Sequence, residues 1–159
     1  MKEKSTHRKH DIFIEGAIDP GVISESISKH ATRMDIGAHE IFLGQIRAYM
    51  DAGSGMDRPA NTVTAIEYTA YKDMALERMT AIREDAFDRW PTITCLHVYH
   101  SLGRIPAGKL CFMVFASAPH RRQAREAVAF VVDAVKKELP IFGRELFDDD
   151  AHKWKTNRS

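Results

Sequence analysis

The sequence predicts an α+β fold in which helices pack on one mostly antiparallel sheet. Two segments, residues 71–90 and 123–139, carry apolar side chains at three- and four-residue steps, as amphipathic helices do, and each ends at a proline. Two strand-like runs, residues 92–99 and 109–117, flank the segment SLGRIPAG, as in a hairpin. Hairpin strands with helices between them are typical of helices layered on an antiparallel sheet.

The chain has the size and composition of one folded domain. Its 159 residues are 44% hydrophobic and 28% charged, and no internal repeat or low-complexity segment divides it. We therefore expect a flexible tail over residues 1–10, followed by a single domain over residues 11–159. Lys and Arg number 23 against 22 Asp and Glu, and the resulting net charge of +1 argues against a dedicated nucleic-acid-binding protein.

Local signals place the elements of the first part of the chain. Residues 11–15 predict a short strand. Asp19 followed by Pro20 predicts a helix that runs to about residue 32, since Asp caps a first turn and Pro is tolerated there. Residues 36–47 predict a strand whose Ile-Phe-Leu run at residues 41–43 suits burial on both faces.

A polar segment then interrupts the strands. Residues 49–61, YMDAGSGMDRPAN, hold Gly, Ser, Asp, Asn and Pro with few apolar side chains. This composition predicts a mobile loop, poorly ordered without substrate. Residues 62–68 return to a strand pattern, so the loop joins two strands.

The sequence predicts a cytoplasmic protein without a bound metal. No apolar run approaches the ~20 residues of a membrane span, and no apolar stretch follows the basic residues 1–10 as it would in a signal peptide. Cys95 and Cys111 are too few for a disulfide framework and lack the spacing of zinc ligands. We interpret both as small core residues in a reducing compartment.

The clearest chemical signal is SAPHRRQAR at residues 117–125. A strand ends there, Ser117 can cap the next helix, and His120, Arg121 and Arg122 lie in or beside its first turn. A helix N-terminus already carries partial positive charge, so three potential cations are unfavourable there unless an anion joins them. The segment predicts a phosphate or carboxylate site; the alternative is that the arginines point into solvent.

Lys136 and Lys137 close the same helix. Cations are favoured in a last turn and usually lie on the surface there. A lysine becomes an acid, a base or a nucleophile only where desolvation or neighbouring cations lower its pKa. A cluster with Arg121 and Arg47 would meet that condition.

Two other groups have the residue types of a metal site without its geometry. His97 and His100 are three apart on a strand and therefore point to opposite faces of the sheet. The acidic run at residues 148–150 consists of adjacent carboxylates, which do not converge without a wrapping loop.

Five segments of the chain occur in the order and spacing of one known family: GAHEIFLGQIR at 37–47, IEYTAYKDMA at 66–75, VYHSLGRIPAGK at 98–109, SAPHRRQAREA at 117–127 and DAVKKELPIFGRE at 133–145. They resemble the large, catalytic subunit of molybdopterin synthase, the MoaE family. The likeness covers roughly residues 11–155, and five ordered segments are more specific than any single motif.

The resemblance implies a fold, an assembly and a reaction. The fold would be α+β of the α/β-hammerhead type, and the protein a homodimer that binds two small ubiquitin-like sulfur carriers, forming a heterotetramer. The carrier's C-terminal glycine thiocarboxylate would give sulfur to cyclic pyranopterin monophosphate, and two rounds would form the dithiolene of molybdopterin. The subunit would be a sulfurtransferase of molybdenum cofactor biosynthesis with no metal or cofactor of its own, and it would bind neither nucleic acid nor membrane.

The same resemblance implies the residues of the site. Lys136 matches the family's catalytic lysine and is also expected to bind substrate. The other substrate-binding positions that it implies are Gln45, Ile46, Arg47, His120, Arg121, Gly143, Arg144 and Glu145. The cations expected to converge on one pocket are Arg47, His120, Arg121 and Lys136. A helix of ~17 residues keeps its ends apart, so the pocket would be elongated along the helix or completed by the partner chain.

Two positions depart from the family's pattern. Gly143 stands where a second lysine commonly precedes Arg-Glu, and Ser101 stands where Arg commonly follows the strand-end His. Arg144, Lys137 or Lys153 would be the substitutes for the missing charge, although Arg does not act as a base at ordinary pH. The alternative is that Gly143 serves a backbone conformation with positive φ.

Two other functions stay open at the level of sequence. A non-catalytic paralogue, which the substitution at Gly143 motivates, would bind pterin or carrier without making dithiolene. An enzyme for another phosphorylated metabolite that shares only the fold would have no affinity for a carrier ending in Gly-Gly.

Overall fold

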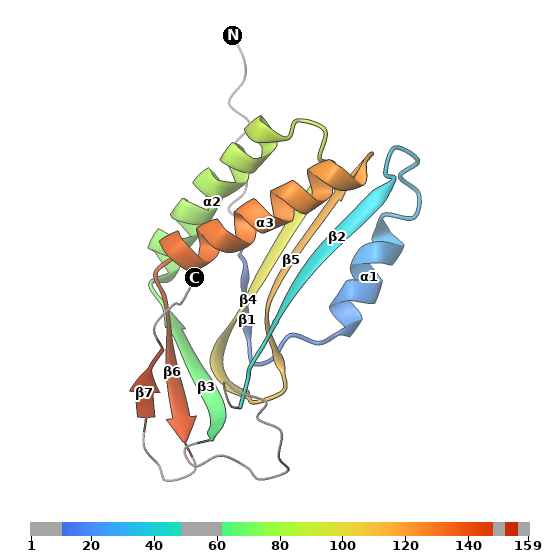
Figure 1. Ribbon diagram of the computed structural model, residues 1–159. Coiled ribbons are helices and arrows are strands. Elements are labelled where there is room, and N and C mark those ends of the chain that lie inside the picture. Colours follow the sequence, from blue (N-terminus) through green and yellow to red (C-terminus); the bar gives the residue numbers. More distant parts are fainter. Residues whose placement is uncertain (1–10, 49–61, 148–151, 156–159) are drawn as a thin grey trace.

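A computed structural model describes residues 11–48, 62–147 and 152–155, in which strands and helices alternate in the predicted α+β manner (Figure 1). The elements in chain order are β1 (Phe13–Glu15), α1 (Gly21–Lys29), β2 (Ala38–Gln45), β3 (Val63–Ala70), α2 (Lys72–Arg89), β4 (Cys95–Pro106), β5 (Leu110–Ala118), α3 (Arg121–Glu138), β6 (Ile141–Phe147) and β7 (His152–Trp154). The tail predicted at residues 1–10 and the loop predicted at residues 49–61 lie outside the described residues.

The strands form one sheet in the order β2-β5-β4-β3-β6-β7, with β1 paired to β4. The β1–β4 pair is parallel and the other pairs are antiparallel, which confirms the predicted sheet type. β4 pairs with β5 through residues 95–100 and with β3 through residues 103–106. It is therefore the strand that joins the two halves of the sheet.

The predicted connection between β4 and β5 is too long. Residues 101–106, which contain the turn-like residues Gly and Pro, continue β4, and the turn is confined to residues 107–109. Gly108 there has φ of +86°, a conformation that suits glycine. The extension of β4 is stabilised by β3, which lies far away in sequence, so the local pattern did not indicate it.

The core has a large part and a small part on opposite faces of the sheet. α2 and α3 cover one face, and α1 packs against the other (Figure 1). β5 is buried on both sides because Phe112 and Val114 face the large core while Met113 and Phe115 face the small one. Burial on both faces was predicted for residues 41–43 of β2, and for β2 this prediction is wrong. β2 lies at the edge of the sheet and leaves Leu43 39% exposed.

The helices begin and end close to their predicted bounds. α2 and α3 lie within two residues of them, and α1 ends three residues early. The Asp19 carboxylate accepts a hydrogen bond of 2.7 Å from the N–H of Gly21, where α1 begins. None of the helices in the described ranges is both long and apolar enough to cross a membrane.

Gly37 allows the start of β2 to lie against the segment that leads into α3. Its N–H donates to the carbonyl oxygen of Ala118 at 3.0 Å. A Cβ at this position would collide with the carbonyl oxygen of Pro119. The absence of a side chain thus sets how closely β2 approaches the start of α3.

We predict that Gly37→Ala lowers the free energy of unfolding by about 1–3 kcal/mol, because a main-chain oxygen cannot rotate away from the added methyl group. Chemical denaturation monitored by circular dichroism measures the change. The matched control is Gly21→Ala, whose methyl group would meet only the flexible Asp19 carboxylate at 3.1 Å. We expect it to change stability by less than about 1 kcal/mol. Equal losses in the two variants would contradict the close approach at Gly37.

Candidate functional site

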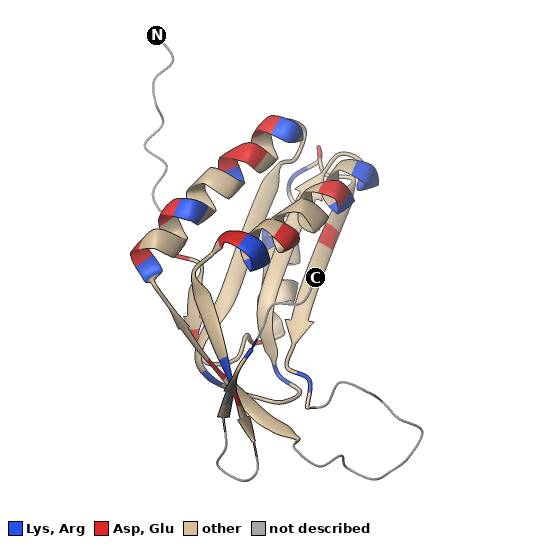
Figure 2. Ribbon diagram, turned by 60° about the vertical axis from the view of Figure 1, so that its left-hand side comes forward, with Lys and Arg blue, Asp and Glu red and all other residues tan. Residues whose placement is uncertain are grey.

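The cations predicted to share one pocket lie at the two ends of α3 in a single chain. Figure 2 shows Lys and Arg positions at both ends of this helix. Arg121 is its first residue, and Lys136 lies in its last turn. At the helical rise they are about 22 Å apart along the axis. Within one chain the two ends of α3 therefore stay apart, as the length of the helix predicted. The charges of Lys136 and Arg47 both act on Lys155.

Ser117 does not cap α3, contrary to the prediction. It is fully buried inside β5, and its hydroxyl forms a hydrogen bond of 2.6 Å with Nδ1 of His39. The N-cap residue is His120, whose backbone is extended and whose side chain makes no capping hydrogen bond. The first turn contains no acidic residue. The start of α3 thus keeps the cationic character that the sequence indicated.

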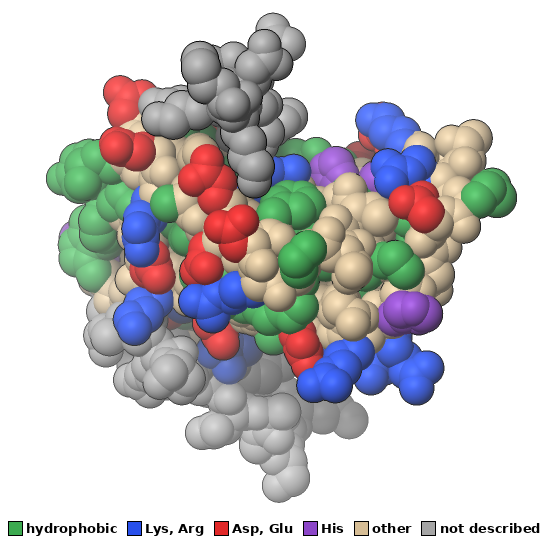
Figure 3. Space-filling model, turned by 90° about the horizontal axis from the view of Figure 1, so that it is seen from above, with side chains coloured by type: hydrophobic (Ala, Val, Ile, Leu, Met, Phe, Trp, Pro, Cys, Tyr) green, Lys and Arg blue, Asp and Glu red, His purple; other side chains and the backbone are tan. Residues whose placement is uncertain are grey.

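The positive charges at this end of α3 differ in their surroundings. Arg122 forms an ion pair of 2.8 Å with Glu126, one turn along the helix. His120 and Arg121 are exposed. Viewed from above, this end of the molecule carries Lys, Arg and His side chains close to one another (Figure 3). In the single chain, His120 and Arg121 face solvent.

The second group of cations is assembled from three separate segments. Arg47 follows β2, Lys136 lies in the last turn of α3, and Lys155 follows β7. Partial burial of the Lys155 amino group lowers its pKa, and the charges of Lys136 and Arg47 lower it further. Cys111 and Glu145 act in the opposite direction. These five side chains are close enough for their charges to interact.

Lys155 lies beside Gly143, the position at which the resemblance implies a lysine. The Lys155 N–H donates to the Gly143 carbonyl oxygen at 2.8 Å, continuing the β6–β7 ladder in which Arg144 pairs with Trp154. Lys155 therefore brings an amine to the neighbourhood of Lys136 from the adjacent strand. The sequence indicated Arg144, Lys137 or Lys153 instead, because the pairing of β6 with β7 is not visible in it.

Arg144 and Glu145 lie on opposite faces of β6. Arg144 donates to the Glu67 carboxylate at 2.6 Å, and the two residues are cross-strand neighbours. Side chains alternate along a strand, so Glu145 shares the face of Gly143 while Arg144 points away from it. Of the predicted pair, Glu145 joins the Lys136 group and Arg144 does not within this chain.

Gln45 and Ile46 differ in whether their side chains are accessible to a ligand. Gln45 is exposed at the end of β2. Ile46 is buried in the large core, and its N–H and carbonyl oxygen bond to Lys109 and Gly108 at 3.0 and 2.8 Å. Ile46 therefore anchors the backbone from which Arg47 extends, and its own side chain is not available to a ligand.

Three buried polar side chains lie next to the lysines. The Tyr68 hydroxyl is 3.8 Å from Sγ of Cys111, and the Tyr68 ring meets the His100 ring edge-on at 4.9 Å between centroids. Burial raises the pKa values of Tyr68 and Cys111. The sequence indicated Cys111 only as a core residue, and nothing in its local pattern distinguishes it from one.

Burial also lowers the pKa of His100 to about 4, and the nearby charges of Lys155 and Lys136 act in the same direction. Its Nδ1 lies 2.8 Å from the carbonyl oxygen of Ser101. His100 contacts Phe112 of the large core, whereas His97 contacts Phe115 of the small core. The prediction that these two histidines occupy opposite faces is confirmed.

Gly143 is not a positive-φ glycine, so that interpretation is wrong. A Cβ there would lie 3.0 Å from Cε1 of Tyr68 and 3.2 Å from Cγ2 of Ile66. The space that a side chain would need is taken by the Tyr68 ring. Glycine at this position lets that ring pack against β6.

The arrangement suits an anionic ligand. Arg47, Lys136 and Lys155 place three positive charges beside neutral, buried side chains. Charges at the rim of a partly desolvated site attract anions more strongly than in bulk water. Because the pKa of Lys155 is lowered, its ammonium group releases a proton more readily than that of a fully hydrated lysine.

Comparisons with known proteins agree on one family. The model of the family described as MoaE protein matches residues 16–138. A molybdopterin synthase catalytic subunit from Drosophila willistoni is 37% identical over 123 residues, which are 77% of this chain and 31% of that protein. The chain spans about a third of the length of the Drosophila relatives that it matches first.

Two solved structures share the fold. A molybdopterin synthase from Staphylococcus aureus has a TM-score of 0.77 at 21% identity, with 94% of this chain and 98% of that chain covered. The complex of subunits 1 and 2 of molybdopterin-converting factor from Helicobacter pylori has a TM-score of 0.73 at 20% identity, with 92% and 90% covered. Both alignments extend over most of the chain, whereas the family match ends at residue 138, before Lys155.

We predict that His100 makes the folded state less stable as the pH falls from 6.5 to about 4. In this window the unfolded chain binds a proton on His100 and the folded chain does not, so the free energy of unfolding decreases with decreasing pH. The shift of the pKa from 6.5 to about 4 corresponds to about 3 kcal/mol. Denaturation of wild type and His100→Asn at several pH values measures it, since other titrating groups cancel in the difference. A difference that does not vary with pH would contradict a neutral, buried His100.

We also predict that Gly143→Lys is destabilising, by about 1–3 kcal/mol, because its Cβ must displace the Tyr68 ring or bend β6. Gly143→Ala introduces the same Cβ without the amine and is expected to lose a similar amount. Thermal denaturation of both variants tests this. A Lys variant as stable as wild type, beside a destabilised Ala variant, would show instead that the site accepts an amine at this position.

Proposed function

The chain belongs to the MoaE protein family, and we propose that it is the catalytic subunit of a molybdopterin synthase. The observation that carries this proposal is the convergence of Arg47, Lys136 and Lys155 beside the buried Cys111. Three cations from segments far apart in sequence repel one another, so their assembly is favourable when an anionic ligand joins them.

The proposed reaction moves sulfur onto a phosphorylated pterin. The donor is the thiocarboxylated C-terminus of a small carrier subunit, and the acceptor is cyclic pyranopterin monophosphate, which becomes the dithiolene of molybdopterin. Both reactants are anions, so one cationic site can hold them together and lower the barrier through proximity. In this proposal the subunit is a sulfurtransferase of molybdenum cofactor biosynthesis that works in the cytoplasm.

We assign different roles to the three cations. Arg47 keeps its charge at all relevant pH values and offers a fork of donors to phosphate or carboxylate oxygens. Lys136, the family's catalytic lysine by resemblance, acts on the reacting groups as proton donor and acceptor or as the acceptor of the spent acyl group. Lys155 supplies the second amine in place of the one that Gly143 lacks. The support for this is its position beside Gly143 and its lowered pKa.

We propose that His120 and Arg121 act through a second copy of the chain. Their exposure and their distance from Lys136, about 22 Å along α3, support a site completed by a partner chain over one elongated along the helix. In a homodimer they would approach the partner's substrate site and contribute to binding phosphate there. The first turn of α3, which has no acidic residue, would then receive the anion that its charge favours.

Exposed apolar side chains on β6, on β7 and at the start of α2 support a partner surface. Tyr71 and Phe142 are 65% and 45% exposed and meet edge-on at 5.7 Å between ring centroids. Met74, in the first turn of α2, and Trp154, on β7 next to Lys155 in the sequence, are also exposed. Such groups are typical of surfaces covered in a complex. The H. pylori structure is a complex of two subunits, and we propose that a small carrier subunit docks on this corner of the present chain.

We predict that Lys136→Ala and Lys155→Ala each reduce dithiolene formation by about 10²–10⁴-fold, because each removes a group that transfers a proton or holds an anion. The assay reconstitutes the protein with thiocarboxylated carrier and cyclic pyranopterin monophosphate and measures the dithiolene product. The matched control is Lys137→Ala, which removes an exposed lysine from the same turn of α3. It is expected to retain activity, and all three variants are expected to keep the melting temperature of the wild type.

Lys155→Arg separates charge from proton transfer. Arg retains the positive charge but does not release a proton, so activity recovered in this variant would limit Lys155 to anion binding. Full activity in Lys155→Ala would remove Lys155 from the mechanism. A wild-type protein that binds the carrier and makes no dithiolene would replace the proposed enzyme with a non-catalytic paralogue.

A further inference from the structure

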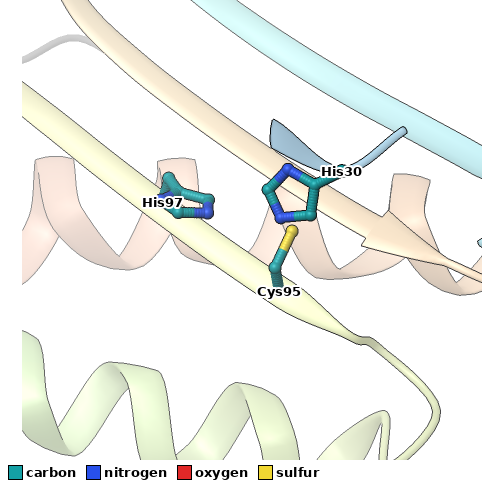
Figure 4. A group of neighbouring side chains, drawn as sticks. All are labelled: His30, Cys95 and His97. Carbon is teal, nitrogen blue, oxygen red and sulfur yellow. The ribbon is translucent and has the colours of Figure 1, made fainter. Parts of the chain in front are cut away.

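Three metal-ligating side chains meet on the face of the sheet opposite Lys136. His30, Cys95 and His97 each offer one ligand atom, and these atoms all lie within 4.8 Å of one another. Figure 4 shows the sulfur of Cys95 directed toward the His30 ring, with the His97 ring alongside. This group plays no part in the proposed sulfur transfer.

The fold brings the three residues together by two different routes. Cys95 and His97 are two positions apart on β4, and side chains at that spacing share a face. His30 is the C-cap residue of α1, which packs on the same face. The Phe115 ring lies 5.8 Å from both histidine rings, so the cluster rests on the small core. The sequence did not indicate this site because His30 lies 65 positions from Cys95.

The His30 ring is already oriented by a neighbouring main-chain group. Its Nδ1 lies 2.6 Å from the carbonyl oxygen of Ser26, one turn back in α1. A carbonyl only accepts a hydrogen bond, so Nδ1 carries the proton and the lone pair of the neutral ring is on Nε2. Histidine ligands of metals are commonly held in this way, with one nitrogen donating to a carbonyl and the other facing the metal.

Burial raises the pKa of the Cys95 thiol, whereas the charges of Arg83 and Arg33 act in the opposite direction. Zinc binding would therefore release the thiol proton. Arg33 is itself paired with Asp35, and Arg83 donates to the carbonyl oxygen of Leu96, so both guanidinium groups are held in place by other partners. Cys95 is a free, partly buried cysteine.

We propose that His30, Cys95 and His97 form a zinc site with a fourth position open to solvent. One thiolate and two imidazoles are donors that zinc prefers, and no carboxylate in the group would favour a harder cation. Donor atoms around a tetrahedral zinc are ~3.5 Å apart. Side-chain rotations that move the three ligand atoms by about 1 Å would bring them to that separation. His39 is left out of the donor set because its Nδ1 is bonded to Ser117 and its ring lies 6.2 Å from that of His30.

The metal would join α1 to the sheet. His30 ends α1, while Cys95 and His97 begin β4, so a bound ion closes a long loop of chain across the small core. Because the unfolded chain does not hold these groups together, binding stabilises the folded state. We expect zinc at about 100 times its Kd to raise the melting temperature by roughly 5–10 °C.

Cobalt titration of the full, metal-free protein tests the site. Co²⁺ replaces zinc in such sites and gives a thiolate-to-metal charge-transfer absorption that imidazole-only binding lacks. We expect one equivalent of Co²⁺ to produce this absorption and one equivalent of Zn²⁺ to abolish it. Cys95→Ser is expected to lose the absorption, and His97→Gln and His30→Gln to weaken Co²⁺ binding at least tenfold. Cys111→Ser removes the other thiol of the chain and is expected to keep the absorption.

Several outcomes would overturn the proposal. If the wild-type protein shows no charge-transfer absorption, the proposed site does not exist. Cobalt bound only by histidines elsewhere in the chain would also give no such absorption. Absorption that persists in Cys95→Ser, or disappears in Cys111→Ser, would show that Cys111 and not Cys95 is the metal ligand. Circular dichroism of each variant without metal separates loss of a ligand from loss of fold, and the zinc-dependent melting temperature of the wild type tests the site without any substitution.

Discussion

The architecture depends on the double pairing of β4. Its first half pairs with β5 and its second half with β3, while β1 joins it where the two halves meet. Main-chain hydrogen bonds of one strand thereby hold both halves of the sheet in a fixed relation. The alternation of side chains along β4 also separates two chemically distinct regions, since His97 and Cys95 face α1 whereas His100 faces Tyr68.

Loss of hydration at Lys155, together with repulsion from neighbouring cations, is an energetic cost of the proposed active site. Arg47, Lys136 and Lys155 are brought together by β2, α3 and β7, and the pKa of Lys155 falls because its ammonium form loses hydration and meets two like charges. Glu145 opposes this shift, whereas burial raises the pKa values of Tyr68 and Cys111 and lowers that of His100, so these three groups favour their neutral forms. The hydrophobic packing of α3 on β5 and β2 stabilises an arrangement that its charges alone would disfavour.

In the proposed site, Lys155 would supply the charge that the family's pattern places at Gly143. Glycine on β6 admits the Tyr68 ring, and the amine arrives from the adjoining strand, one hydrogen bond away. A comparison of this sequence with the family's pattern, position by position, shows only that a lysine is missing at 143. The pairing of β6 with β7 brings Lys155 beside that position. The positive charge of the proposed site therefore comes from several elements, and a single sequence motif records only some of its residues.

The sequence by itself determined the class of fold, the amphipathic helices and the cationic start of α3, because these follow from periodicity and from residue types within a few positions of one another. Five ordered segments also indicated the family, including Lys136 and Arg47. Only the tertiary structure decided that β4 continues to Pro106, that β2 is an edge strand, that Lys155 lies beside Gly143, and that His30 meets Cys95 and His97. Each of these depends on which strand pairs with which and on where a distant helix packs. Such pairings are set by hydrogen bonds and burial between residues far apart in the chain, and no local pattern records them.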